Sequence, residues 1–193
     1  MNTVPSHLVI NAALEKKWGG RYKLAKKAFL WGSVAPDFAL GVLSVGYFIY
    51  SRFLTPDNAR NMMENAFSDL YFNNPWWIAS HNFLHSPTAL ILYAALLWRY
   101  FDQPNTRGHN ALSFVFGCMV HSVVDILTHY DDGPVLFWPF EWHIRFFSPV
   151  SYWDRAHYAD QFFWVEVGIN LVLAGYLFGP SVIQRFKKFR ARE

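Results

Sequence analysis

Four apolar segments stand out along the chain, and each contains a single acidic or basic residue. They are residues 28–50, 87–101, 111–130 and 161–179. None keeps the alternation of apolar and polar positions that is typical of a half-buried strand, and the sequence has no internal repeat. The pattern therefore predicts an all-α fold built on four apolar helices, with shorter helices between them.

Polar residues, glycines and prolines mark where these helices begin and end. Pro36-Asp37 interrupts the first apolar segment, and Ser86-Pro87 places a capping residue before a proline at the first helical position. Gly179-Pro180 is a stop signal that predicts the end of the last helix. Near the N-terminus, Leu8–Glu15 is expected to form a short helix with Ser6 as its N-cap.

The composition favours a membrane protein. Hydrophobic residues make up 53% of the 193-residue chain and charged residues 16%, whereas soluble domains contain about 25% charged residues. Aromatic residues reach 20%, which suits a bilayer interface. Two of the four apolar segments approach the roughly 20 residues that span a bilayer. Full spanning is therefore preferred over a peripheral or half-embedded bundle, with the polar segment 58–70 as a helix outside the membrane.

Basic residues gather in two clusters that flank the apolar region. Residues 16–27 hold six of the 17 Lys and Arg residues, and residues 185–192 hold five. A nucleic-acid-binding protein would also be basic, but the positive-inside rule explains why the clusters lie beside apolar segments. We therefore expect residues 1–193 to form a single membrane domain with both termini in the cytoplasm, in contact with membrane lipids and without nucleic acid.

One face of the third apolar segment carries ionisable and polar side chains. At about 100° per residue, one side of a helix presents His121, Asp125, Thr128 and His129. Burying a carboxylate and two imidazoles is costly unless each has a partner, and a divalent metal ion can satisfy all three. The simpler interpretation of His121 and Asp125 is a hydrogen-bonded pair that only holds helices together.

Further imidazoles and a carboxylate lie near other helix breaks and ends. They are His7, Asp37, His81 and His85. Asp37 could instead cap the helix after the Pro36 break, and the histidines could be polar residues at helix ends. Together with His121 and Asp125, the set supplies the nitrogen and oxygen ligands that zinc, manganese or iron accept.

Five short motifs follow one another over residues 6–145. They are Ser6-His7-Leu8, Pro36-Asp37, Phe83-Leu84-His85-Ser86, His121-Ser-Val-Val-Asp125-Ile-Leu-Thr128 and Gly133–Pro139. In order and approximate spacing, they resemble the YdjM-type metal-dependent hydrolases of the bacterial inner membrane, which are similar to helical zinc-dependent phospholipase C. The resemblance implies an inner-membrane location. It also implies a metal-binding set of His7, Asp37, His85, His121 and Asp125.

Two positions depart from the family's pattern and put a second metal in doubt. The family often has a second acid two residues after the Pro-Asp aspartate, where this chain has Ala39. It often has Arg-Gly-x-Thr before the His-Ser pair, where this chain has residues 81–84. His81 is then either a substitute ligand or a residue that supports one, and His129 is either a ligand or part of a pocket wall.

The predicted topology conflicts with His7 as a ligand. If residues 28–50 span the membrane as a straight rod, His7 and His85 lie on opposite sides of it. Either His7 is not a ligand, or the first segments do not span as simple rods. A broken or re-entrant segment at Pro36 is physically reasonable, and we adopt it because it agrees with the family resemblance.

The expected activity is metal-assisted hydrolysis of a phosphoester, with a lipid or another small molecule near the membrane as substrate. The ion, Zn²⁺ by preference and otherwise Mn²⁺ or Fe²⁺, would be held by Asp37, His85, His121 and Asp125, with His7 as a fifth ligand. Asp37, Asp131 or Asp132 would accept a proton from water. The alternatives are a structural or transport metal site without catalysis, and a proton relay that includes Glu166.

Overall fold

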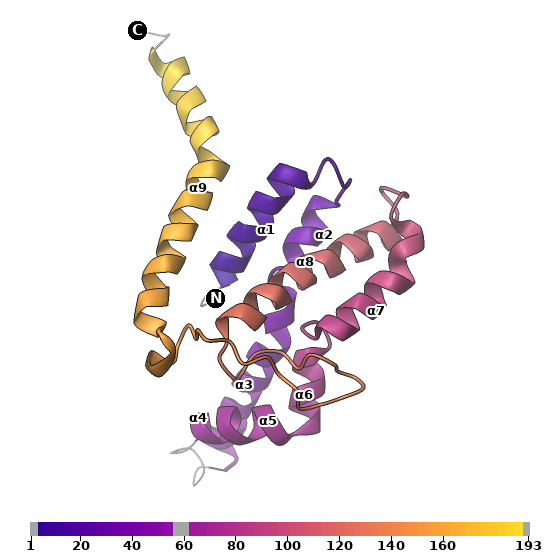
Figure 1. Cartoon of the computed structure of the whole chain (residues 1–193), viewed down its shortest axis with the longest axis vertical. Helices are drawn as coiled ribbons and strands as arrows, with labels where there is room; N and C mark the ends of the chain where they lie inside the picture. Colours follow the sequence, from indigo (N-terminus) through magenta and orange to yellow (C-terminus); the bar gives the residue numbers. More distant parts are fainter. Residues whose placement is uncertain (1–3, 56–61, 191–193) are drawn as a thin grey trace.

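The computed structural model describes residues 4–55 and 62–190, and in these residues every regular element is a helix (Figure 1). The elements are α1 (Val4–Trp18), α2 (Lys26–Trp31), α3 (Ala35–Phe53), α4 (Met62–Glu64), the π-helical turn η2 (Asn65–Leu70), α5 (Tyr71–Asn73), α6 (Pro75–Asn82), α7 (Pro87–Leu97), the 3₁₀ turn η3 (Trp98–Tyr100), α8 (Arg107–Thr128), the 3₁₀ turn η4 (Arg155–His157) and α9 (Ala159–Arg190). The all-α prediction is confirmed. The predicted polar helix 58–70 is helical from residue 62, and its first residues lie outside the described part of the chain.

Two helices in the described residues, α8 and α9, are long and apolar enough to cross a membrane. Their mean hydropathies over the best window are 1.7 and 1.6. Half of that window is buried within the protein in α8, but only 6% is buried in α9. The prediction of four apolar helices is not confirmed, because residues 28–50 are divided between α2 and α3 and because α7 has only 11 residues.

The core forms where α8 packs between α2 and α7. A cluster of buried side chains joins α7 to α8, and it consists of Leu90, Ala94, Leu112, Val115 and Cys118. On the other side of α8, Gly32 and Gly117 let the backbones of α2 and α8 meet, since a Cβ on either glycine would clash with backbone of the opposite helix. The buried Asn11 of α1 donates hydrogen bonds to the carbonyls of Phe29 and Gly117. Asn11 therefore ties three helices together.

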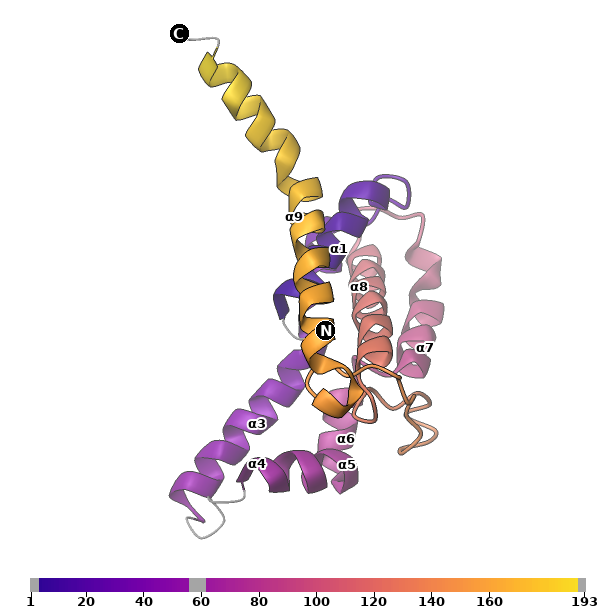
Figure 2. The same cartoon turned by 60° about the vertical axis from the view of Figure 1, so that its left-hand side comes forward.

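The N-terminal helix also holds α9 in place, beside it in Figures 1 and 2. Ser6 is not the N-cap that we predicted, because α1 already begins at Val4. Its hydroxyl instead donates a 2.5 Å hydrogen bond to Glu166 and accepts one of 2.7 Å from Asn170. The buried carboxylate of Glu166 thus finds its partner on α1.

The predicted stop at Gly179-Pro180 is wrong, because α9 continues through Pro180 to Arg190. A proline inside a helix removes the N–H that would bind the carbonyl four residues earlier, which here belongs to Tyr176. The ammonium group of Lys16 donates to that carbonyl at 2.6 Å and to the carbonyl of Leu177 at 3.1 Å. A side chain from another helix therefore replaces the missing donor, and α9 extends beyond the bundle (Figure 2).

A Gly117→Ala variant tests the close contact between α2 and α8. The added methyl group would meet the carbonyl oxygen of Phe29, so the helices must separate, and the free energy of unfolding should fall by roughly 1–3 kcal/mol. Thermal and denaturant unfolding in detergent measure the change. The matched control is Gly168→Ala, where a Cβ meets no atom within 4 Å and stability should rise by up to about 1 kcal/mol. Equal effects of the two substitutions would contradict the close approach.

Candidate metal centre

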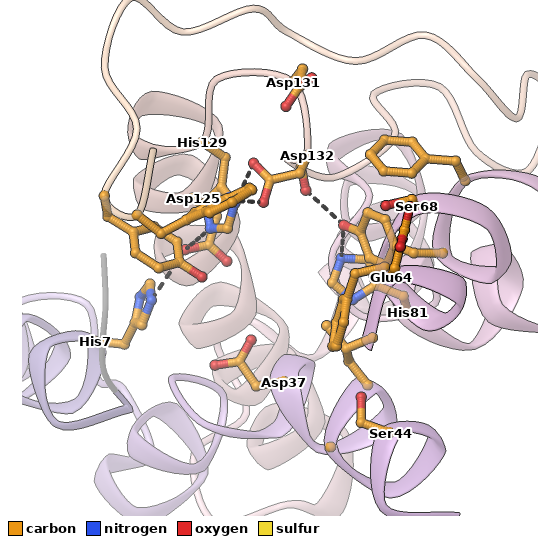
Figure 3. A pocket seen from close by; sticks show the side chains of 17 residues that line it. His7, Asp37, Ser44, Glu64, Ser68, His81, Asp125, His129, Asp131 and Asp132 are labelled. Atoms are coloured by element: carbon orange, nitrogen blue, oxygen red, sulfur yellow. Dashed lines mark hydrogen bonds and ion pairs between the residues drawn. The ribbon is translucent and has the colours of Figure 1, made fainter. Parts of the chain in front are cut away.

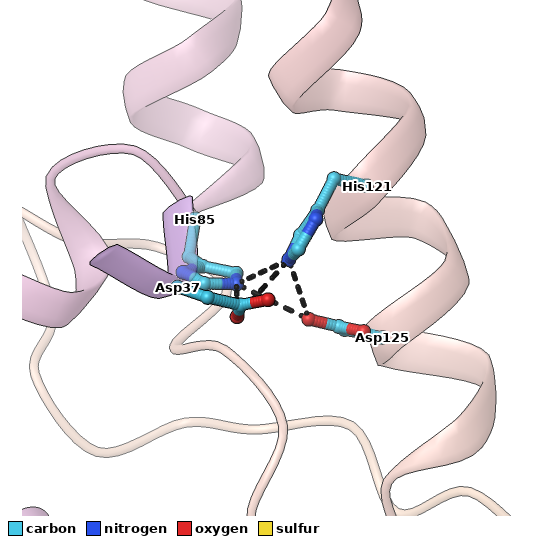
Figure 4. A group of neighbouring side chains, drawn as sticks. All are labelled: Asp37, His85, His121 and Asp125. Atoms are coloured by element: carbon cyan, nitrogen blue, oxygen red, sulfur yellow. Dashed lines mark hydrogen bonds and ion pairs between the residues drawn. The ribbon is translucent and has the colours of Figure 1, made fainter. Parts of the chain in front are cut away.

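Four ionisable side chains from three parts of the fold converge at one point (Figure 4). Asp37 lies in the first turn of α3, and His85 lies in the turn between α6 and α7. His121 and Asp125 are one turn apart on α8, on the same helix face as the sequence predicted. The two histidines are fully buried, Asp125 is almost so, and the side chain of Asp37 is 38% exposed.

The ligand atoms of these residues have the separations that a small cation requires. The Nε2 atoms of His85 and His121 are 2.9 Å apart, and Oδ2 of Asp125 lies 3.1 Å and 3.0 Å from them. Oδ1 of Asp37 lies 3.6 Å and 3.4 Å from the same two nitrogens. A tetrahedral ion with bonds of about 2.0–2.1 Å places its ligands about 3.3 Å apart. Five of the six separations, at 2.9–3.6 Å, therefore bracket the value for a tetrahedral site with two nitrogen and two oxygen ligands.

The hydrogen bonds of the two histidines leave both Nε2 atoms without a proton when the rings are neutral. Nδ1 of His85 lies 3.2 Å from the carbonyl oxygen of His81, and Nδ1 of His121 lies 2.8 Å from that of Ser33. A carbonyl oxygen only accepts, so each Nδ1 must donate and each neutral ring presents a lone pair at Nε2. Metal-binding histidines are oriented by this kind of backbone contact. Two lone pairs that face each other between two carboxylates favour a positive charge between them, which a metal ion or a proton on one ring can supply.

His7 approaches the centre from α1 but lies outside the group of four. Its Nε2 is 3.1 Å from Oδ1 of Asp125, and its ring stacks on that of His121 with centroids 3.8 Å apart. Asp125 therefore presents one oxygen to His7 and the other to His85 and His121. The chain is broken as expected, but at residues 32–34 and not at Pro36, which lies in the first turn of α3. Residues 28–50 therefore do not form a straight rod, and His7 lies beside the centre.

His81 also lies outside the group of four and takes part in a different network. The Tyr71 hydroxyl donates to the carbonyl oxygen of Asp132 at 2.7 Å and accepts from Nη1 of Arg145 at 3.3 Å. Nε2 of His81 lies 3.0 Å from the same hydroxyl. Burial lowers the pKa of His81 well below its usual value, and the neighbouring His85 and Arg145 act in the same direction. His81 is therefore a neutral imidazole that supports the site from beside His85.

His129 and Asp132 form a pair at the C-terminal end of α8. Nδ1 of His129 is 3.1 Å from Asp132, whereas its Nε2 is 3.8 Å from Oδ1 of Asp125. Burial would raise the pKa of Asp132, but the close contact with His129 and the hydrogen bond from Trp153 outweigh burial and lower this pKa. His129 therefore lines the cavity wall, which is one of the two roles predicted for it; the other was a metal ligand.

A cavity of about 1040 Å³ opens beside the centre (Figure 3). In the view of Figure 3, His7 lies on the left, Glu64 and His81 on the right, and Asp131 and Asp132 above. Asp37 extends into the space from below. The cavity is also lined by apolar side chains, which include Leu40, Phe67 and Phe72. The candidate centre is therefore open to the cavity on the side where Asp37 lies.

The fold and the site together define an all-helical protein with apolar helices and a buried cluster of histidine and aspartate. The sequence model of the YdjM inner membrane protein family matches residues 1–184. The chain belongs to this family, which confirms the resemblance and extends it beyond the motifs that suggested it. No curated protein and no solved structure matches the chain. The inner-membrane location is therefore supported by the family and by the two apolar helices.

Several residues that shape the centre carried no signal in the sequence. The carbonyl of Ser33 orients His121, and the hydroxyl of Ser122 donates a 2.5 Å hydrogen bond to the carbonyl of His85. Tyr71 and Arg145 fix His81. Only the Gly32-Ser33 pair between two apolar runs could have indicated a break, because glycine and serine are common in turns.

A Tyr71→Phe variant tests the network around His81. Removing the hydroxyl deprives the buried donors of His81 and Arg145 of an acceptor, so the free energy of unfolding should fall by about 1–3 kcal/mol. Thermal unfolding measures the loss. Tyr22→Phe is the control because this ring is exposed, and its effect should stay within about 0.5 kcal/mol. If both variants unfold like the parent protein, the proposed hydrogen bonds do not contribute.

Proposed function

We propose that this protein is a membrane-bound, metal-dependent hydrolase that acts on a phosphoester. The observation that carries the proposal is the pair of facing Nε2 lone pairs, 2.9 Å apart, enclosed by two carboxylates. Zn²⁺ is the preferred ion because two imidazoles and two carboxylates in a tetrahedral arrangement suit it, with Mn²⁺ and Fe²⁺ as alternatives. Asp37, His85, His121 and Asp125 would hold the ion.

The accessibility of the centre favours catalysis over a closed structural site. His85 and His121 are fully buried, but Asp37 is partly exposed and lines the cavity together with Asp125. A catalytic site needs a coordination position that water and substrate can reach, whereas a structural site is enclosed by protein ligands. The candidate ligands also gather at one point, which argues against a relay that would distribute ionisable groups across the membrane.

The proposed reaction converts a phosphodiester and water into a phosphomonoester and an alcohol. Asp37, His85, His121 and Asp125 would hold a divalent ion, which would lower the pKa of a water toward about 7 and make the phosphoryl group more electrophilic. The water oxygen bonds to phosphorus while the bond from phosphorus to the alcohol oxygen breaks, and the departing alkoxide gains a proton. The free oxygen of Asp37 is best placed to accept the proton of the water, and Asp131 or Asp132 at the cavity wall can carry it onward.

His7 is the proposed fifth ligand. It approaches the oxygen of Asp125 that His85 and His121 do not use, so the carboxylate of Asp125 can join His7 to the other ligands. A lipid is the favoured substrate because the cavity of an inner-membrane protein is lined here by apolar side chains as well as by carboxylates. A water-soluble small-molecule phosphoester is the second possibility.

Metal content and hydrolysis test the proposal in one experiment. Purified protein should contain about one or two equivalents of divalent metal by elemental mass spectrometry, and the double variant His121→Ala/Asp125→Ala should lose most of it. A panel of phosphodiesters and phospholipids should be hydrolysed by the parent protein. The activity should disappear with chelator, return with added Zn²⁺, and be absent in the double variant.

The matched control is His143→Ala/Asp102→Ala, which removes an exposed histidine and an exposed aspartate outside the centre. This variant should keep both metal and activity. Metal content that is unchanged in the His121→Ala/Asp125→Ala variant would refute the metal centre. Metal that is bound without hydrolysis of any ester would favour the alternative, a structural or transport site.

We also propose that the end of the molecule that carries the turn between α1 and α2 faces the cytoplasm. The basic cluster at residues 16–27 lies at this turn, and the C-terminal end of α9 lies toward the same end of the long axis (Figures 1 and 2). The N-terminal end of α1 lies beside the metal centre, and α1 runs from there toward the basic cluster. The proposal therefore places only the C-terminus in the cytoplasm. An alkaline phosphatase fused after residue 193 should be inactive in cells, since it folds only outside the cytoplasm. An active fusion would reverse the orientation.

A further inference from the structure

The cavity beside the candidate centre offers a ligand negative charge and hydrogen-bond acceptors. Among the lining residues that the structure describes there are five carboxylates and no lysine or arginine. They are Asp37, Glu64, Asp125, Asp131 and Asp132. A divalent ion held by two of them leaves a formal charge of three minus on the wall. A purely anionic ligand would meet repulsion everywhere except at the metal.

Two donors at the wall are already in use, whereas Nη2 of the buried Arg145 and Nδ1 of His7 have no hydrogen-bond partner. Nε1 of Trp153 donates to Oδ2 of Asp132 at 2.9 Å, and the Tyr71 hydroxyl donates to the carbonyl oxygen of Asp132. Arg145 is buried behind Tyr71, where it donates to Tyr71 and to the carbonyl of Gly133. The cavity is also lined by the hydroxyls of Ser44, Ser68 and Tyr152, and a hydroxyl can act as a donor or as an acceptor.

Nδ1 of His81 is a further hydrogen-bond acceptor, as the contacts of the Tyr71 hydroxyl show. The single proton of the Tyr71 hydroxyl points to a carbonyl oxygen, so this hydroxyl can only accept from His81. Nε2 of His81 must therefore carry the proton, and Nδ1 presents a lone pair. That Nδ1 is buried and has no hydrogen-bond partner, and His81 lines the cavity. An unused, buried acceptor of this kind indicates that a ligand supplies a donor.

Asp131 and Asp132 form an acidic rim of the cavity, and aromatic rings lie beside them. Tyr152 and Trp153 line the cavity beside Asp131 and Asp132, and Trp153 is 60% exposed. Carboxylates combined with aromatic faces form the environment that binds ammonium groups. The cavity is also lined by Leu40, Phe67 and Phe72, which suit an apolar part of the same ligand.

We propose that the substrate is an amphiphilic phosphoester whose alcohol part carries an ammonium group. This inference rests on the proposed function. The phosphoryl group lies at the metal centre, the ammonium group lies against Asp131 and Asp132, and the apolar part lies along α3 and η2. The same negative wall disfavours esters of neutral alcohols such as glycerol, because their negative phosphate has no positive group to offset the repulsion.

Matched substrates test this selectivity. The soluble arm compares p-nitrophenyl phosphoethanolamine with p-nitrophenyl phosphoglycerol, and the lipid arm compares phosphatidylethanolamine with phosphatidylglycerol in detergent micelles. The ratio of kcat/KM should favour the ammonium ester by about tenfold or more, which corresponds to about 1.4 kcal/mol. A preference in both arms assigns the selectivity to the head group, and a preference in the lipid arm alone shows that the apolar part is also required.

Charge reversal at Asp131 tests whether this carboxylate produces the preference for the ammonium ester. Asp131→Lys should lower the ratio of kcat/KM values by about tenfold through KM, while metal content stays unchanged. Asp102→Lys, at a residue that does not line the cavity, should leave both unchanged. Binding of phosphoethanolamine and of glycerol phosphate to the metal-loaded protein gives a readout that is independent of turnover, and Asp131→Lys should weaken only the first.

The outcomes separate the two proposals. No hydrolysis of any ester overturns the proposed function. Hydrolysis without an ammonium preference, or a preference that Asp131→Lys does not change, overturns this inference alone. Loss of metal in Asp131→Lys also overturns it, because the rim carboxylates would then hold a metal ion and not the substrate.

Discussion

The contact between the Nε2 atoms of His85 and His121 is the constraint on which the rest of the site depends. Both rings are fully buried, and the Nδ1–H group of each ring donates to a backbone carbonyl. Without a positive charge between them, two lone pairs and two carboxylates would repel one another in a region of low dielectric. The fold accepts this arrangement because several helices hold the groups rigidly. The core contacts of α8 with α2 and α7 can therefore be understood as the scaffold of the candidate cation site.

The polar interior of this protein is organised in layers around that point. The Asp125 carboxylate contacts three histidines directly. Outside it, Tyr71, Arg145 and Asp132 hold His81 and the chain segment that follows α8. The loop after α8 is fastened to α7 in turn, because Ser86 and Thr88 donate to the carbonyl of Leu136. This continuity explains how a long loop without regular strands can form a wall of the cavity.

The sequence predicted those features that depend on local patterns. The helical class, the shared face of His121 and Asp125, and the start of α7 after Ser86 were predicted from local patterns, and the structure contains all of them. Ser86 makes no side-chain capping bond, however, because its hydroxyl donates to the carbonyls of Leu136 and Trp138. The continuation of α9 through Pro180 could not be predicted, because the donor that permits it comes from Lys16, 164 residues earlier. The same holds for Ser33, whose role depends on a carbonyl that any residue would carry. Long-range contacts and backbone groups leave little trace in a single sequence.

The short break between α2 and α3 has a consequence for how the chain can vary in length. Ser33 orients His121, and Asp37, only four residues later, faces the same point. One inserted residue in this interval would turn α3 by about 100° relative to α2 and carry Asp37 away from His85. The connection between η3 and α8, at residues 101–106, lies outside the site and has no such restriction. Insertions and deletions should therefore be distributed unevenly among natural variants, with a fixed spacing from residue 33 to residue 37.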